Sequence, residues 1–118
     1  MDATWKETTL QSYVTNEVPE SLRLDYKAPK ALFDENELCK DVSSFLNSQG
    51  GTLIYGMHED KRNPPRPISI EGITGSTMNR ERIDQILTTN IHPRFDPKEY
   101  HIEVVQLADG SNVFVVEM

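Results

Sequence analysis

The alternation of apolar and polar residues predicts a strand, a helix and a second strand in the first half of the chain. Apolar and charged residues alternate over residues 22–27, which is the period of a strand with one buried face. Apolar residues then recur at helical spacing over residues 35–48, and Asp34 at the start of this segment offers an N-cap. The nearly continuous apolar run 52–57 predicts a central strand that is covered on both faces. The positions that carry this pattern are Leu22, Leu24 and Tyr26 in the first strand, and Leu38, Val42, Phe45 and Leu46 in the helix.

The second half continues with a strand, a helix and a hairpin. Residues 58–67 contain three prolines and alternating charges, which predicts a surface loop, and a short strand follows around residues 68–72. Isoleucine and leucine at helical spacing predict a helix over residues 79–92, with Thr77 or Asn79 as its N-cap. Two apolar strands joined by an Asp-Gly turn predict a hairpin over residues 100–116.

These elements indicate one α+β domain in which a mixed or antiparallel sheet is covered by the helices near 35–48 and 79–92. A length of 118 residues suits one hydrophobic core. Residues 1–16 are expected to form a lead-in segment, with Leu10, Tyr13 and Val14 spaced to dock a short helix. Residues 17–118 then form the domain. Because the chain stops directly after an apolar strand, we expect the domain to be truncated at Met118 and to be attached to further domains.

Charge and composition restrict the partners. The formal net charge of −7 disfavours strong non-specific binding of nucleic acid, which normally requires a basic face. No apolar run reaches the roughly 20 residues that span a bilayer, and no signal-peptide pattern opens the chain. Cys39 is the single cysteine, so an internal disulfide is excluded and a reducing cytoplasm is the expected compartment.

A double glycine joins the first helix to the central strand. Asn47, Gly50 and Gly51 lie in this polar turn, where glycine permits positive φ and a close approach of backbone or ligand. Two interpretations stay open for the turn. It is either a simple helix C-cap or part of a ligand-binding face.

The order of the patterns resembles a known family. An acidic strand at 20–27, a helix, an Asn-x-x-Gly-Gly turn, an apolar strand and an acidic turn at 58–61 together resemble the Schlafen-type Alba-like domain, formerly described as a divergent AAA-associated, DNA-binding module. The resemblance covers roughly residues 17–118. It implies a nucleic-acid-binding module of a larger regulatory protein, such as a transcriptional regulator, or of a defence protein.

The resemblance also implies a trio of acidic residues that binds Mg²⁺ or Mn²⁺ and supports phosphodiester cleavage in the nuclease members. The first two positions correspond to Glu20 and Asp25, where Asp25 replaces the more common Glu. His58 stands where the third Asp is common, which leaves Glu59 or Asp60 as substitutes. Oxygen ligands suit both hard cations. The alternative is that these are ordinary solvated carboxylates.

Three functions therefore remain open from the sequence. The first is nucleic-acid binding through a face that includes Lys27 and the double-glycine turn, with contributions from Arg62 and Arg66. The second is metal-dependent cleavage of RNA or DNA by the acidic residues. The third is protein interaction or homodimerisation, which the negative charge favours. The sequence lacks a phosphate-binding Gly-Lys-Ser/Thr loop, a dinucleotide fingerprint, a serine nucleophile elbow and a zinc ligand set.

Overall fold

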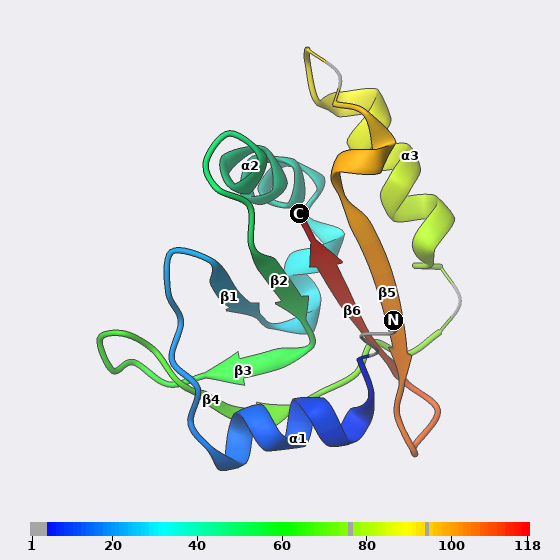
Figure 1. Ribbon diagram of the computed structural model, residues 1–118. Helices are drawn as coiled ribbons and strands as arrows, with labels where there is room; N and C mark the ends of the chain where they lie inside the picture. Colours follow the sequence, from blue (N-terminus) through cyan, green and yellow to red (C-terminus); the bar gives the residue numbers. More distant parts are fainter. Residues whose placement is uncertain (1–4, 76, 94) are drawn as a thin grey trace.

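The computed structural model describes residues 5–75, 77–93 and 95–118 and contains a mixed sheet with helices packed against it (Figure 1). The strands of this sheet run in the order β1-β2-β6-β5, with β1 parallel to β2 and the other neighbours antiparallel. A second, two-stranded sheet pairs β3 with β4. The elements are α1 (Glu7–Thr15), β1 (Leu24–Lys27), η1 (Pro29–Phe33), α2 (Glu35–Leu46), β2 (Thr52–Tyr55), β3 (Met57–Glu59), β4 (Pro67–Ile70), α3 (Arg80–Asn90), η2 (Pro97–Glu99), β5 (His101–Gln106) and β6 (Asn112–Glu117).

Strand β2 is the buried centre that its sequence predicts. It lies between β1 and β6, and Leu53, Ile54 and Tyr55 are all fully buried. Burial of each of these large apolar side chains contributes roughly 1.5–3 kcal/mol. The predicted α+β class and mixed sheet are therefore confirmed.

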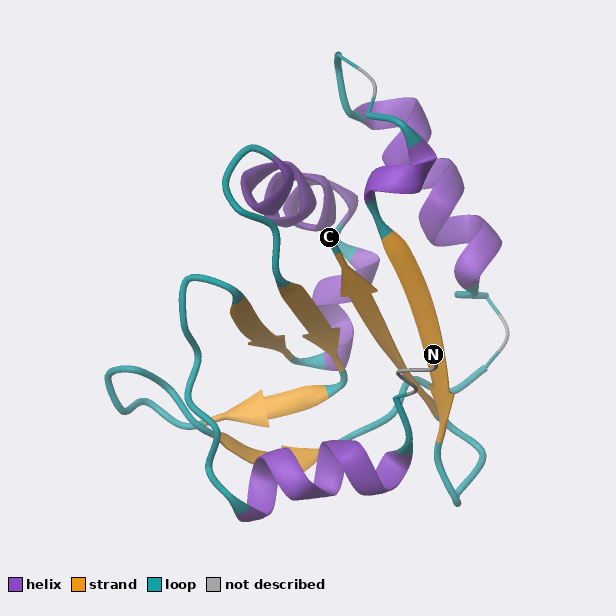
Figure 2. Cartoon of the chain, in the orientation of Figure 1, coloured by secondary structure: helices purple, strands orange, loops and turns teal. Residues whose placement is uncertain are grey.

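Alternate residues of β2 face two separate cores. Leu53 and Tyr55 pack with residues of η1, α2 and α3, including Leu38 and Ile83. Ile54 faces the opposite side, where it joins a cluster that contains Leu10 of α1. Figure 2 shows α1 beside β4 and apart from α2 and α3. The sheet is thus covered by α2 and α3 on one face, and by α1 with the small sheet on the other.

The two main helices begin where their capping residues predict. The Asp34 side chain accepts a hydrogen bond of 3.1 Å from the Glu37 amide at the start of α2. Asn79, one of the two expected caps, accepts a 2.7 Å hydrogen bond from the Arg82 amide at the start of α3. Each cap satisfies an amide that the first helical turn leaves unpaired. No helix in the described ranges has the length and apolar character needed to cross a membrane.

The predicted burial of Leu22 is wrong. Strand β1 begins only at Leu24, and the preceding residues form a tight turn in which the Ser21 and Leu24 backbones bond to each other at 3.0 and 3.3 Å. This turn removes Leu22 from the strand alternation, and its side chain is 93% exposed. Tyr26 is fully buried, as expected.

The predicted loop over residues 58–67 is also partly wrong. Its first two residues belong to β3, which pairs with β4, so that only residues 60–66 form the connecting loop. Gly56, with φ of 123°, turns the chain from β2 into β3. A side chain there would place its Cβ 2.8 Å from Val113 Cγ2, so glycine permits this change of direction. The C-terminal hairpin of β5 and β6 forms as predicted.

Candidate functional site

Three carboxylates from three segments converge beside β1. Glu20 lies before the Ser21–Leu24 turn, Asp25 lies in β1, and Glu59 ends β3. One oxygen atom of each lies within 4.8 Å of the others. We call these three residues the carboxylate trio. The side chain of Asp25 therefore reaches the cluster despite being shorter than glutamate.

The backbone around Glu20 holds its carboxylate in place. The Tyr26 amide donates a 3.0 Å hydrogen bond to Glu20 Oε2, and the Glu20 amide donates to the Pro65 carbonyl at 2.9 Å. The hydroxyl of the buried Tyr26 donates to the Val18 carbonyl at 2.7 Å, which fixes the segment that leads to Glu20. The orientation of Glu20 thus depends on main-chain contacts from β1 and from the loop between β3 and β4.

Burial and mutual repulsion make ionisation of Asp25 and Glu20 costly. Burial, followed by hydrogen bonding to and repulsion from Glu20, raises the pKa of Asp25 to about 7, although Lys27 acts in the opposite direction. Burial also raises the pKa of Glu20, and Glu59 adds to that rise. When carboxyl groups lie this close together, the ionisation of one disfavours the ionisation of its neighbours unless a cation compensates the negative charge.

Lys27 supplies one compensating charge at the edge of the trio. Its Nζ lies 3.4 Å from Asp25 Oδ2 and 3.7 Å from Asp41 Oδ2. Burial lowers the pKa of Lys27, but the two carboxylates outweigh burial and raise it. Tyr55 donates a 3.5 Å hydrogen bond to Asp41 from the core. The sequence reasoning missed Asp41, which lies in α2 next to the buried Val42.

Asp60, the alternative third carboxylate, is directed elsewhere. It accepts hydrogen bonds from the Arg66 and Arg62 amides, each at 3.0 Å, and from the Arg62 guanidinium. These contacts, led by the Arg66 amide, lower the pKa of Asp60. His58 instead contacts Glu71. Of the two substitutes left open by the sequence, the structure gathers Glu59 with Glu20 and Asp25.

The residues expected on a ligand face are dispersed. Gly50 and Gly51 approach the protein's own backbone, because an added Cβ would lie 2.5 Å from the Met118 carbonyl oxygen and 2.7 Å from that of Arg23, respectively. Asn47 is an exposed C-cap of α2. Of the residues predicted to form the ligand face, Lys27 is the one that contacts the trio in the described part of the chain.

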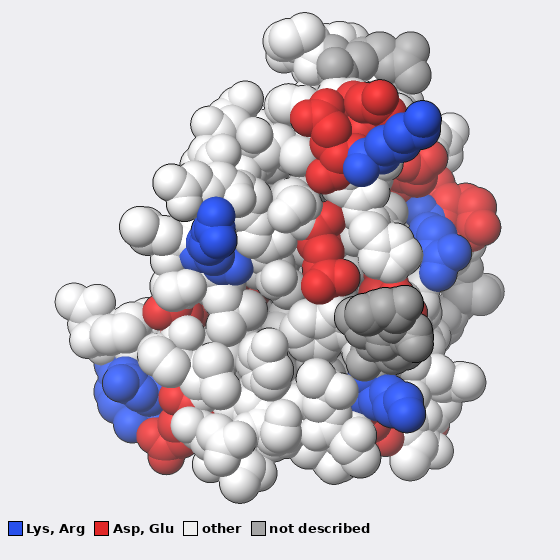
Figure 3. Space-filling model, viewed as in Figure 1, with Lys and Arg blue, Asp and Glu red and all other residues white. Residues whose placement is uncertain are grey.

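The two arginines predicted to contribute to the ligand face, Arg62 and Arg66, lie in the loop between β3 and β4. Arg62 pairs with Glu17 and Asp60, and the Arg66 guanidinium donates to the Pro64 carbonyl at 2.8 Å. On the face shown in Figure 3, Lys and Arg form separate patches with acidic residues among them. This face therefore offers no continuous basic track for a phosphate backbone.

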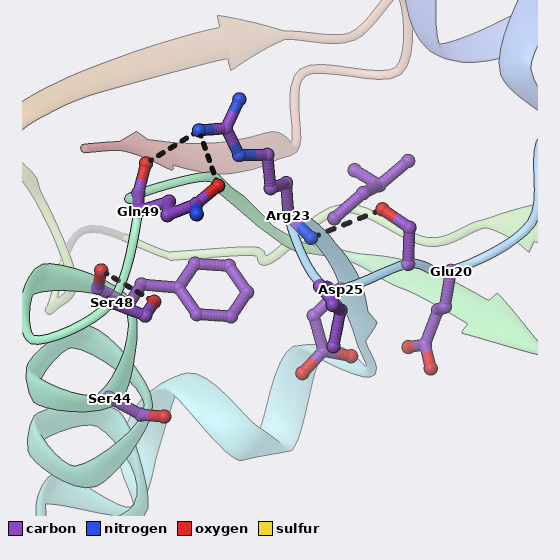
Figure 4. A pocket seen from close by; sticks show the side chains of 10 residues that line it. Glu20, Arg23, Asp25, Ser44, Ser48 and Gln49 are labelled. Atoms are coloured by element: carbon purple, nitrogen blue, oxygen red, sulfur yellow. Dashed lines mark hydrogen bonds between the residues drawn. The ribbon is translucent and has the colours of Figure 1, made fainter.

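A pocket of about 480 Å³ adjoins the carboxylate trio (Figure 4). Glu20 and Asp25 belong both to the trio and to the pocket wall. The rest of the wall comes from the turn before β1, from the first residue of β1, and from the C-terminal end of α2 with the residues that follow it. These residues are Ser21, Leu22, Arg23, Leu24, Ser44, Phe45, Ser48 and Gln49. Sequence reasoning missed this pocket because the strand pattern assigned Leu22 to the core.

The chemistry of the trio fits a hard divalent cation. Its three donors are carboxylate oxygens, the ligand type that Mg²⁺ and Mn²⁺ prefer. Burial is the main cause of the raised pKa of Asp25 and Glu20, and a cation would offset the repulsion that adds to it. A zinc site is disfavoured, because no histidine or cysteine joins the trio among the described residues.

Comparison with known proteins identifies the family. No curated protein matches the chain. The model of the family described as Schlafen, AlbA_2 matches residues 20–118, a range that begins at Glu20 and includes the whole trio. The family fits an association with nucleic acid. Since the match covers most of the 118 residues, the chain belongs to the Schlafen, AlbA_2 family.

Proposed function

We propose that this domain cleaves the phosphodiester backbone of RNA or DNA, with Glu20, Asp25 and Glu59 as ligands of a divalent cation. The observation that carries the proposal is the convergence of three incompletely compensated carboxylates from separate segments, within 4.8 Å of one another. A surface carboxylate usually remains solvated or pairs with a basic residue, as Asp60 does. Family membership supports nucleic acid as the substrate class.

The chain's own residues would orient both the trio and a phosphate. Mg²⁺ or Mn²⁺ in such a site supplies positive charge to a phosphate oxygen and lowers the pKa of bound water. The Tyr26 amide presents Glu20 in a fixed direction before any ligand arrives. Lys27, held between Asp25 and Asp41, offers an ammonium group to a phosphate oxygen beside the trio.

The test is a cleavage assay with end-labelled structured RNA and single-stranded DNA, in Mn²⁺ and in excess chelator. Wild-type protein should cut in Mn²⁺ alone, and Asp25→Asn should leave the substrate intact. Asp60→Asn is the matched control, because it makes the same chemical change at a carboxylate outside the trio. Intact substrate with wild-type protein, or equal cleavage by Asp25→Asn, would contradict the proposal.

Nucleic-acid binding without cleavage is the second candidate function. It is supported by the same family match and requires no catalytic metal. Its expected strength is low, because the net charge is −7 and the basic residues in Figure 3 are dispersed. Salt-sensitive binding in the absence of any metal-dependent cleavage would favour this candidate.

A further inference from the structure

We propose that the pocket beside the carboxylate trio accepts an unpaired base next to the phosphate that the trio engages. The inference rests on the proposed function and specifies its substrate class as a single-stranded segment of nucleic acid. Four features of the pocket support it: its continuity with the trio, its apolar wall, its oriented arginine and its volume.

The pocket and the trio are one continuous site. Glu20 and Asp25 form part of the pocket wall, so a nucleotide whose phosphate lies at these carboxylates has its neighbouring base beside the pocket. A volume of about 480 Å³ falls within the range of roughly 300–1,000 Å³ that is typical of small-molecule sites. The pocket therefore has room for a base and part of its sugar.

Apolar side chains line the pocket without filling it. Leu22 is 93% exposed, and no core contact explains an apolar residue at this position. Phe45 and Leu24, both half-buried, lie on the same wall. Apolar and aromatic surfaces bind the faces of unstacked bases with little preference for sequence. This wall is suited to a base that has left a stack.

An oriented cation lies across the pocket from the carboxylates. Arg23 Nη2 donates to the Gln49 backbone carbonyl at 3.2 Å and to its side-chain Oε1 at 3.1 Å. Figure 4 shows Arg23 and Gln49 on one side of the pocket, and Glu20 and Asp25 on the other. No carboxylate pairs with Arg23 among the described residues, so its charge is available for a second phosphate. A strand would thus place one phosphate at the trio, a base in the pocket and the next phosphate at Arg23.

Duplex substrates do not meet this requirement. A base in a duplex is paired and stacked, and its removal from the stack costs a few kcal/mol. An unpaired base in a loop or a single strand enters at a much smaller cost. We therefore expect this domain to favour single-stranded over fully paired nucleic acid.

The test measures binding in Ca²⁺, a hard cation with the same preference for oxygen ligands, and a denaturing gel confirms that each probe stays intact, so that the result does not depend on catalysis. The probes are a fluorescein-labelled single-stranded RNA, the same RNA in a blunt duplex, and the same strand with abasic sites, each followed by fluorescence anisotropy. The wild type should bind the intact single strand most tightly. Leu22→Ala should weaken that binding about three- to tenfold, the effect of losing one buried apolar contact, and should leave duplex binding unchanged.

Two control variants distinguish the pocket from the rest of the surface. Ile68→Ala removes another exposed apolar side chain, 55% exposed and outside the pocket, and should bind like wild type. Arg23→Gln should weaken the binding of single strands. It should also reduce the slope of log affinity against log salt concentration by about the contribution of one phosphate contact. Lys40→Gln, a change at an exposed cation outside the pocket, should leave binding near the wild-type value.

The outcomes separate this inference from the proposed function. Equal binding of single strand, abasic strand and duplex, or an unchanged affinity of Leu22→Ala, would overturn the pocket inference even if metal-dependent cleavage is found. A Leu22-dependent preference for the intact single strand would support the inference even if no cleavage is found.

Discussion

Glu59 and Asp60 are adjacent in the chain and have opposite electrostatic surroundings. Glu59 joins two other carboxylates, whereas Asp60 accepts hydrogen bonds from two backbone amides and an arginine. The pKa of Asp25 in the trio is raised, and that of Asp60 is lowered. The pairing register of β3 with β4 shifts between His58 and Glu59, directly before these two residues diverge.

Asp60 is a carboxylate whose charge stabilises the folded state, whereas Asp25 is one whose charge destabilises it. The interactions of Asp60 favour its charged form in the folded state, so they contribute to stability at neutral pH. The trio does the reverse, since ionised Asp25 is disfavoured by burial and by Glu20. A cluster that costs stability is typical of a binding or catalytic site.

The largest expected effect is on cleavage. Glu20→Gln, Asp25→Asn and Glu59→Gln should each reduce the metal-dependent cleavage rate by about 100-fold or more, the usual size of losing a group that stabilises transition-state charge. Single-turnover rates in Mn²⁺ measure this directly. If Glu59→Gln cuts at the wild-type rate while Asp60→Asn does not, the assignment of the two neighbours is reversed.

The next effect is a gain in stability on removing a trio charge. Without solvent screening, a rise in the pKa of Asp25 from 3.8 to about 7 lowers the free energy of unfolding by about 4 kcal/mol when Asp25 is ionised. Solvent screening of a side chain that is 26% exposed reduces this to about 1–2 kcal/mol. We therefore expect Asp25→Asn to be more stable than wild type by that amount at pH 8, as measured by urea unfolding.

The pH dependence of this gain follows from the sign of the shift. Because the folded pKa of Asp25 is raised, the folded state binds more protons between about pH 4 and pH 7. Wild-type stability should fall as the pH rises through this window, and the advantage of Asp25→Asn should vanish near pH 4. Lower stability of Asp25→Asn at pH 8 would indicate instead that the contact with Lys27 makes Asp25 a stabilising residue.

A third effect is stabilisation by a divalent cation. A ligand that binds only the folded state adds about 1.4 kcal/mol at ten times its Kd. Mn²⁺ should therefore raise the melting temperature of wild type and of Asp60→Asn, but not that of Glu20→Gln. Equal shifts in all three proteins, measured by scanning fluorimetry, would place the bound ion outside the trio.

The smallest effect concerns Asp60 itself. Asp60→Asn should lower stability slightly at pH 7, because it weakens the contacts with Arg62 and the Arg66 amide. The wild-type advantage should disappear as the pH falls through the lowered folded pKa of Asp60, which lies below its ordinary value of 3.8. Urea unfolding at pH 7 and at pH 3 tests this, and a stabilised Asp60→Asn would contradict it.

Local sequence patterns were sufficient for most of the fold. The helix periods, the caps Asp34 and Asn79 and the apolar run of β2 all depend on neighbours in the chain, and all were predicted. Strand β3 was missed because it has three residues, of which His58 and Glu59 are polar. Leu22 was misplaced because a tight turn interrupts an alternation that otherwise resembles a longer strand.

The site was less predictable because it depends on contacts between distant segments. Glu20 and Asp25 were found through their resemblance to a family motif, but the choice between Glu59 and Asp60 depends on how β3 pairs with β4 and on the register shift in that pairing. Asp41 contacts Lys27 across the packing of α2 against the sheet. The sequence carries no local signal for such a contact or for the pocket.

The most direct test of the central claim is calorimetric titration of Mn²⁺ into wild type, Glu59→Gln and Asp60→Asn. The account predicts a saturable site in wild type and in Asp60→Asn, and its loss in Glu59→Gln. Retention of the site in Glu59→Gln, or no binding to the wild type, would show that the carboxylate trio does not form a cation site.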